Sequence, residues 1–325
     1  MTNALQSWFD EVAAKRAAAA NPTEQTTEEA HAELMREKAE ERAKTPKSIA
    51  RRAEEEAREV GFSARLLVQA TLPHSKPAQG VTEFQRSNGH VTVKILADST
   101  YGLPYGTYPR LLLSWVTTEA VQTKSPELEL GDSLRQFMNR LGMEYGGGPR
   151  GAGPRLRQHM QRLFSSTVSA TYQSKGEWHR INVPPVERAS IFWDPKRPNQ
   201  ISLWKSSIRL NQSFYEEIVR HPVPVDMDVL RALARSKSPL ALDIYQWLTH
   251  RMSYLQDPAT VPWEALKLQF GGDYNRTRDF KAKFLLHLKQ VIELYPQAHV
   301  DPGSSGLKLL PSRPHVPMRL LRGRR

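Results

Sequence analysis

The chain has 325 residues, 39% of them hydrophobic, and a formal net charge of +12. It contains no cysteine, which excludes disulfides, thiolate zinc sites and cysteine nucleophiles. No apolar run approaches 18 residues and no secretory signal pattern opens the chain, so we expect a cytoplasmic protein with no membrane contact.

The charge is distributed unevenly along the chain. Residues 1–60 hold 10 basic and 13 acidic side chains, which leaves 36 basic and 21 acidic ones in the remainder. Such a basic excess suits a polyanion, because Lys and Arg that neutralise phosphates release condensed counterions. A basic protein without a polyanion partner would show the same charge.

The first 60 residues are rich in Ala, Glu, Arg and Lys, and they hold few large apolar side chains. Pro22 and Pro46 divide them into three helical pieces. We predict a charged helical arm over residues 1–60, loosely attached to the body of the protein.

A change of pattern at Leu66 opens the predicted first domain, residues 61–222. Apolar residues alternate after the Asn88-Gly89 turn signal, which predicts a hairpin, and the apolar segment 111–121 predicts a central helix. Asp132 or Ser133 is placed to cap a helix that runs to Leu141.

A Gly-rich connector then leads to a basic amphipathic helix over Arg155–Phe164, which completes a candidate helix-turn-helix. Its apolar residues fall within one arc: Leu156, Met160, Leu163 and Phe164. Basic and amide side chains lie opposite that arc. Segments 167–172 and 178–181 around Lys175-Gly176 predict the hairpin of a wing, and segments 191–193 and 201–204 predict a further strand pair.

The same order recurs in the predicted second domain, residues 223–312. The Pro-rich break at 221–224 is interpreted as the linker. Beyond it the pattern predicts helices at 227–234, 240–255 and 262–271, a basic helix at 277–295, and strands at 298–300 and 307–310. Lys281 falls on the apolar arc of the basic helix, so either its stem covers apolar surface or the helix begins later.

The two basic helices supply the candidate DNA-binding residues. A recognition helix enters the major groove, where Arg can hold guanine and Gln can hold adenine. Residues near a helix N-terminus and Lys-rich faces favour phosphate contact instead. The candidates are Arg150, Arg155, Arg157, Gln158, Gln161 and Arg162 in the first domain, and Arg276, Arg278, Lys281, Lys283 and Lys289 in the second. The Arg-rich tail, residues 313–325, is interpreted as a disordered end.

Asp226 and Asp228 resemble the paired carboxylates of metal-dependent nucleases and primases, which is the enzymatic alternative. Asp before an amphipathic helix is ordinarily a cap, and no third acidic ligand is identifiable. The sequence therefore predicts no catalytic residue, no metal site and no cofactor.

Five segments resemble RepA-type plasmid replication initiators. They are LPYGTYPRLLLSWVTTEAV (103–121), GPRLRQHMQRLF (153–164), FWDPKRPNQISLW (192–204), FYEEIVRHPVPVDMDVLRAL (214–233) and LDIYQWLTHR (242–251). The resemblance covers roughly residues 60–312. It implies a non-enzymatic initiator that binds repeated origin sequences, helps to open AT-rich duplex and assists loading of the host helicase with the host initiator. It also implies tandem winged helices and a homodimeric form that represses its own promoter.

Together these observations predict an α+β protein with two winged-helix (helix-turn-helix) domains in tandem behind a helical arm. The predicted partners are double-stranded origin DNA and the host initiator and helicase. A plasmid or phage transcriptional regulator of the same fold would share every DNA-binding feature and stays an alternative.

Overall fold

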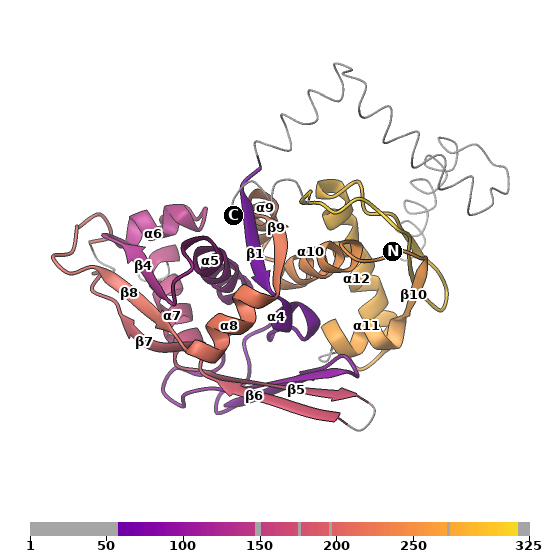
Figure 1. Cartoon of the computed structure of the whole chain (residues 1–325), viewed down its shortest axis with the longest axis horizontal. Coiled ribbons are helices and arrows are strands. Elements are labelled where there is room, and N and C mark those ends of the chain that lie inside the picture. The colour runs from indigo at the N-terminus through magenta and orange to yellow at the C-terminus, as the bar shows by residue number, and fades with distance from the viewer. Residues whose placement is uncertain (1–57, 147–150, 175–176, 195–196, 272–273, 318–325) are drawn as a thin grey trace, which may run out of the picture.

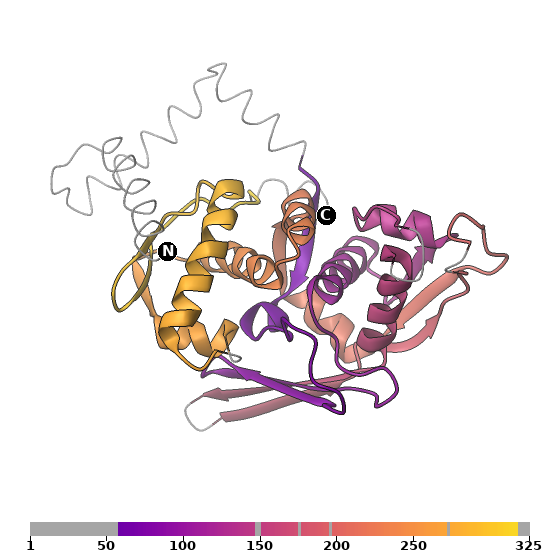
Figure 2. The ribbon, with the colours of Figure 1, turned by 180° about the vertical axis from the view of Figure 1, so that it is seen from behind.

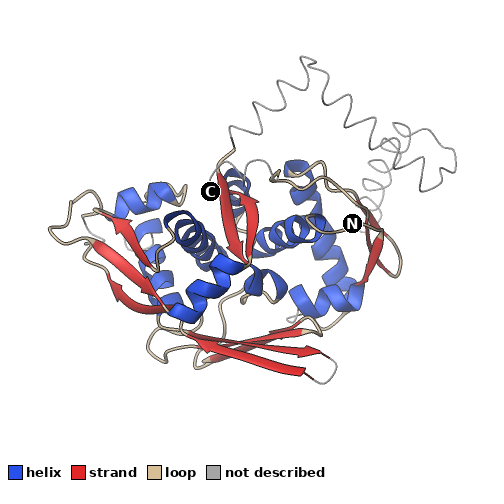
Figure 3. Ribbon diagram, viewed as in Figure 1, coloured by secondary structure: helices blue, strands red, loops and turns tan. Residues whose placement is uncertain are grey.

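The computed structural model describes residues 58–146, 151–174, 177–194, 197–271 and 274–317 (Figure 1). The predicted arm lies outside these ranges except for its last three residues, and so does most of the Arg-rich tail. Helices and small antiparallel sheets alternate along the chain, which confirms the α+β class (Figure 3). No helix in the described ranges is long and apolar enough to span a membrane.

Three helices and a three-stranded sheet form the first module, residues 107–210. Its elements are α5 (Thr107–Thr123), β4 (Glu127–Gly131), α6 (Leu134–Arg140), α7 (Ala152–Phe164), β7 (Val186–Ser190) and β8 (Ser206–Leu210). The last strand lies in the middle of the sheet, between β4 and β7, and both pairings are antiparallel.

The second module, residues 239–309, repeats that order. Its elements are α10 (Pro239–Met252), β10 (Ala259–Pro262), α11 (Trp263–Phe270), α12 (Thr277–Leu294), β11 (Val300–Pro302) and β12 (Gly306–Leu309). Again the last strand is central, in the order β10-β12-β11. The duplicated plan expected from the sequence is therefore present, with a strand between the first two helices that the pattern did not reveal.

The hairpin predicted as the wing of the first domain forms, but it belongs to another sheet. β5 (Thr167–Ser174) and β6 (Glu177–Val183) continue a four-stranded antiparallel sheet that starts with β2 (Glu83–Ser87) and β3 (Val91–Leu96). This sheet lies along one edge of the molecule and extends towards the second module, where α11 packs against β2 (Figure 1). Pairing of β5 with β3 recruits the hairpin, and sequence spacing cannot show such a non-local pairing.

The second predicted strand pair is displaced. Segments 191–193 and 201–204 are not strands; they lie in the long loop between β7 and β8. Trp193 is buried there against Phe137, at a ring-centroid distance of 5.2 Å, whereas Leu203 and Trp204 are 98% and 70% exposed. The apolar character that suggested strands thus comes from one packed and several solvent-facing loop residues.

The predicted linker is also a strand. β9 (Pro222–Asp226) pairs antiparallel with β1 (Val60–Ala64), so that Val60 faces Asp226 and Ala64 faces Pro222. Pro is compatible with this two-stranded sheet because both strands are edges. Around it lie three short helices, α4 (Arg65–Gln69), α8 (Gln212–Arg220) and α9 (Met227–Arg235), and the β1–β9 pair stands between the modules (Figure 1).

The buried apolar side chains divide into two clusters. The first contains residues from Ala64 to Ile218, and the second contains mainly residues from Val223 to Leu309. Leu111 of α5 belongs to the second cluster although most of that helix packs in the first. The modules therefore share a packed boundary.

Candidate nucleic-acid interface

Helix α7 buries the apolar arc predicted from its sequence. Leu156, Met160 and Leu163 are at most 1% exposed, and the helix begins at Ala152, three residues earlier than expected. Pro154 fits its first turn because the backbone N–H groups there lack intrahelical acceptors. Arg155 and Gln158 are exposed on the opposite face, and Gln161 is half-buried.

Two of the predicted arginines of α7 are held by neighbouring backbone. Arg157 donates to the Trp193 carbonyl at 3.2 Å, and Arg162 donates to the Leu103 carbonyl at 3.3 Å. The Arg162 guanidinium also lies over the Tyr105 ring, 5.4 Å from its centroid. Arg150 falls outside the described residues. The sequence alone could not show which of Arg150, Arg157 and Arg162 contact neighbouring backbone, because all three face away from the apolar arc or precede it.

His159, in the middle of α7, is buried against aromatic rings rather than presented to a ligand. Its ring stacks on Tyr108 at 4.8 Å between centroids and meets Tyr105 edge-on at 5.0 Å. Burial, together with the positive charges of Arg162 and Arg155, lowers the pKa of His159 to about 4. The ring is therefore neutral at physiological pH and serves packing.

Helix α12 presents its cations unequally. Arg278 and Lys283 are exposed, and Lys289 is half-buried. Arg276 is also exposed, and it pairs with Asp279 at 2.8 Å.

Lys281 lies on the apolar arc as the sequence indicated, and the first of the two explanations is correct. Its ammonium lies 4.7 Å from the Trp263 ring centroid and donates to the Gly303 carbonyl at 2.9 Å, while burial lowers its pKa.

A cleft of about 920 Å³ lies between the two modules, and both basic helices border it. Arg155 and His159 line it from α7, and His287 lines it from α12. Lys283 stands close enough to His287 to help lower that ring's pKa, after burial as the main cause. Figure 2 shows α7 and α12 on either side of the central helices. Of the predicted DNA-binding residues that the structure describes, Arg155 lines the cleft, and α12 reaches it through His287.

Cations that sequence reasoning did not select also line this cleft. Lys76, Arg235 and Lys237 are exposed there, and Arg231 is held by Glu59, Asp228 and the Arg140 carbonyl. Lys76 lies in a loop, Lys237 lies in a turn and Arg235 ends α9, so helical periodicity gives no signal for them. The N-terminus of α10 opens at the same place, where Ser238 and Pro239 line the cleft, and the positive end of the helix dipole favours anions there.

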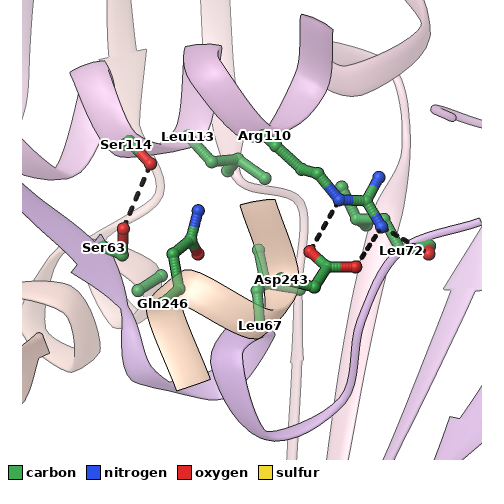
Figure 4. Close-up of a pocket in the computed structure, with 9 residues that line it drawn as sticks. Ser63, Leu67, Leu72, Arg110, Leu113, Ser114, Asp243 and Gln246 are labelled. Carbon is green, nitrogen blue, oxygen red and sulfur yellow. Dashed lines mark hydrogen bonds and ion pairs between the residues drawn. The ribbon is translucent and has the colours of Figure 1, made fainter. Parts of the chain in front are cut away.

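A buried ion pair fixes the two modules relative to each other beside this cleft. Arg110 of α5 forms a bidentate contact with Asp243 of α10, with both nitrogen–oxygen distances at 2.7 Å (Figure 4). His74 bonds the same carboxylate at 2.7 Å, and Arg110 also donates to the Leu72 carbonyl at 2.8 Å. Burial by itself would raise the pKa of Asp243, but Arg110 and His74 outweigh it and lower that pKa.

The carboxylates considered for metal binding have a structural role. Asp226 caps α9, accepting from the backbone N–H groups of Asp228 and Val229 at 3.0 and 3.3 Å. Burial raises its pKa. Within the described ranges, no group of three or more His, Asp or Glu side chains could hold a metal ion.

Comparison with known proteins identifies the chain. No curated protein matches it. Residues 103–264, from the loop before α5 to the start of α11, match the family model described as plasmid encoded RepA protein. All five segments quoted above lie entirely within these residues, as does α7. The chain therefore belongs to the RepA family of plasmid-encoded replication proteins.

Proposed function

We propose that this protein is a plasmid replication initiator that binds repeated origin sequences through two winged helices, formed by residues 61–222 and 223–312. The observation that carries the proposal is the twofold occurrence of one element order, with a basic helix at the equivalent place in each module. In a winged helix, the third helix enters the major groove and the following hairpin flanks it. Helices α7 and α12 are the third helices, and the β7–β8 and β11–β12 hairpins are the wings.

The exposed side chains of the two helices suit different contacts with DNA. Arg155 and Gln158 of α7 are exposed and would contact base edges and adjacent phosphates, whereas Arg278 and Lys283 of α12, also exposed, would contact the DNA backbone. Arg157, Arg162 and Lys281 support these surfaces through their contacts with backbone carbonyls. We further propose, from the family, that origin binding leads to duplex opening and to loading of the host helicase with the host initiator. Dimers of the chain would repress its own promoter.

The first test is footprinting of the full-length protein on DNA flanking its own gene, followed by affinity measurements on the protected repeats. With 6–10 phosphates contacted, the logarithm of the affinity should fall against the logarithm of the salt concentration with a slope of about −5 to −9. A flat salt response would contradict the proposal.

Base reading is tested by Gln158→Ala, with Gln122→Ala at the exposed end of α5 as its control. Loss of a bidentate contact should relax discrimination at one base pair by about 5- to 150-fold, the equivalent of about 1–3 kcal/mol. Gln122→Ala should bind as the wild type does. An unchanged base preference in the Gln158→Ala variant would show that Gln158 does not read a base.

An initiator is distinguished from a regulator by transforming cells with a plasmid that carries the minimal origin and this gene. Replication supports the initiator. Specific binding without replication favours a transcriptional regulator of the same fold.

A further inference from the structure

We propose that the cleft between the modules grips the sugar-phosphate backbone of the duplex segment that joins the two contacted grooves, through Lys76, Arg235 and Lys237. This inference rests on the proposed function and assigns to the interface a surface that lies on neither recognition helix. The three cations come from two separate segments, the loop after His74 and the end of α9 with the turn that follows it, and with Arg155 they line one cavity.

Within the part of the chain that the structure describes, the positive charges in this cleft are not balanced by acidic partners. Lys76, Arg235 and Lys237 are exposed, and within the described ranges they make no ion pair. Among the described residues, Glu144 is the one acidic residue in the lining of this cleft. By contrast, the exposed cations of the first module's sheet face glutamates: Lys205 pairs with Glu129 at 3.1 Å and Arg209 with Glu127 at 3.2 Å.

Converging like charges repel one another, and folding gains nothing from leaving them uncompensated. An external anion that enters the cleft relieves this repulsion. Because the cations are exposed and carried on long side chains, they suit phosphates without reading bases.

The position of the cleft selects the backbone of a duplex over a small anion. Its two walls carry α7 and α12, so a duplex that contacts both helices has to pass its intervening strand across the opening. The volume of the cleft, about 920 Å³, is also large enough to admit a phosphodiester strand.

The test compares two variants that lose the same number of charges. Arg235→Gln with Lys237→Gln removes two cations from the cleft. Lys124→Gln with Arg220→Gln removes two exposed cations elsewhere. Lys124 follows the C-terminus of α5, about 25 Å along the helix from the end that lines the cleft. Thermal unfolding checks that both variants fold.

Affinity is measured by fluorescence anisotropy on a footprinted origin repeat and on a scrambled duplex, over a range of salt concentrations. The cleft variant should bind both duplexes roughly tenfold or more weakly at 0.1 M salt, and the steepness of its salt dependence should fall by about 2. The control variant should stay within about twofold of wild type on both.

Three results would overturn the inference while the proposed function stands. One is wild-type affinity and salt slope in the cleft variant. Another is a loss confined to the origin repeat, which would indicate base reading. The third is stoichiometric binding of inorganic pyrophosphate that the cleft variant loses while its DNA affinity is unchanged, which would indicate a small-anion site. Failure of the wild type itself to bind any origin duplex would instead contradict the proposed function.

Discussion

Single cations of the same chemistry have different surroundings in this protein. Lys281 and Lys283 are two residues apart on α12, and about 200° of helical rotation separates them. Lys281 points to Trp263 and the Gly303 carbonyl, whereas Lys283 is exposed. Their roles should therefore separate in experiment.

Lys281→Met should lower the free energy of unfolding by about 1–2 kcal/mol, because it removes a cation–π contact and a hydrogen bond. It should leave the salt dependence of DNA binding unchanged. Lys283→Met should do the reverse, leaving stability unchanged and reducing the steepness of the salt slope by about 0.9. Urea unfolding and anisotropy measure both quantities, and equal effects of the two variants on DNA binding would contradict the assignment.

His159 makes stability depend on pH. The pKa of an unperturbed histidine is about 6.5 in the unfolded chain, whereas burial holds that of His159 at about 4. The unfolded state then binds more protons between these values, so stability falls as the pH drops through this window.

His159→Phe keeps the ring stack on Tyr108 and removes the titration. Between pH 6.5 and pH 4.5 the wild type should lose about 2 kcal/mol more unfolding free energy than this variant. His250 and His315, whose pKa values burial lowers to about 4 and about 3, contribute equally to both proteins. Urea unfolding at the two pH values measures the difference, and parallel losses would rule out the neutral, buried state of His159.

At the scale of elements, close strand pairing decides which small residues are required. Gly306 pairs with Pro262 across the β10–β12 ladder, and a Cβ there would come within 2.4 Å of the Val261 carbonyl oxygen. Gly303 lies at the tip of the β11–β12 hairpin, and a Cβ there would have no atom nearer than 3.4 Å.

Gly306→Ala should therefore lower the free energy of unfolding by about 1–3 kcal/mol, because the backbone has to shift to admit the methyl group. Gly303→Ala is the matched control and should stay within about 0.5 kcal/mol of wild type. Thermal or urea unfolding compares the two. Equal stability of both variants would contradict the close approach of β12 to β10.

At the scale of the whole molecule, polar contacts as well as apolar packing join the second module to the segment around α4 and to the first module. Gln269 of α11 donates to the Val68 carbonyl at 2.9 Å, and its own carbonyl accepts from Thr71 at 3.2 Å. The Arg110–Asp243 pair adds a charged contact that is almost completely buried. A buried charge that loses its partner is strongly unfavourable.

Asp243→Asn should lower the free energy of unfolding by about 3–5 kcal/mol, because Arg110 keeps its charge without a carboxylate. Replacing both residues, Arg110→Met with Asp243→Leu, should recover much of this loss, since no buried charge is then left. Tryptophan fluorescence during urea unfolding gives both values. A loss below about 1 kcal/mol in the single variant would show that the pair is not buried in solution.

The amino-acid sequence by itself determined the helices other than α4 and α8, and the duplicated plan. Apolar spacing located α7 and α12, because both bury one stripe, and Ser133 and Asp226 marked helix starts through their caps. Family-like segments also identified the replication family. These properties depend on neighbours within one or two helical turns, which a sequence displays directly.

Tertiary structure alone decided which strands pair and which cations face solvent. The β5–β6 hairpin joins β3, and the Pro222–Asp226 segment joins β1, through pairings between residues far apart in the chain. Likewise, Lys76 and Arg235 meet in one cleft although they lie in different segments. Such contacts depend on packing between distant segments, and no local pattern encodes which partner each segment will find.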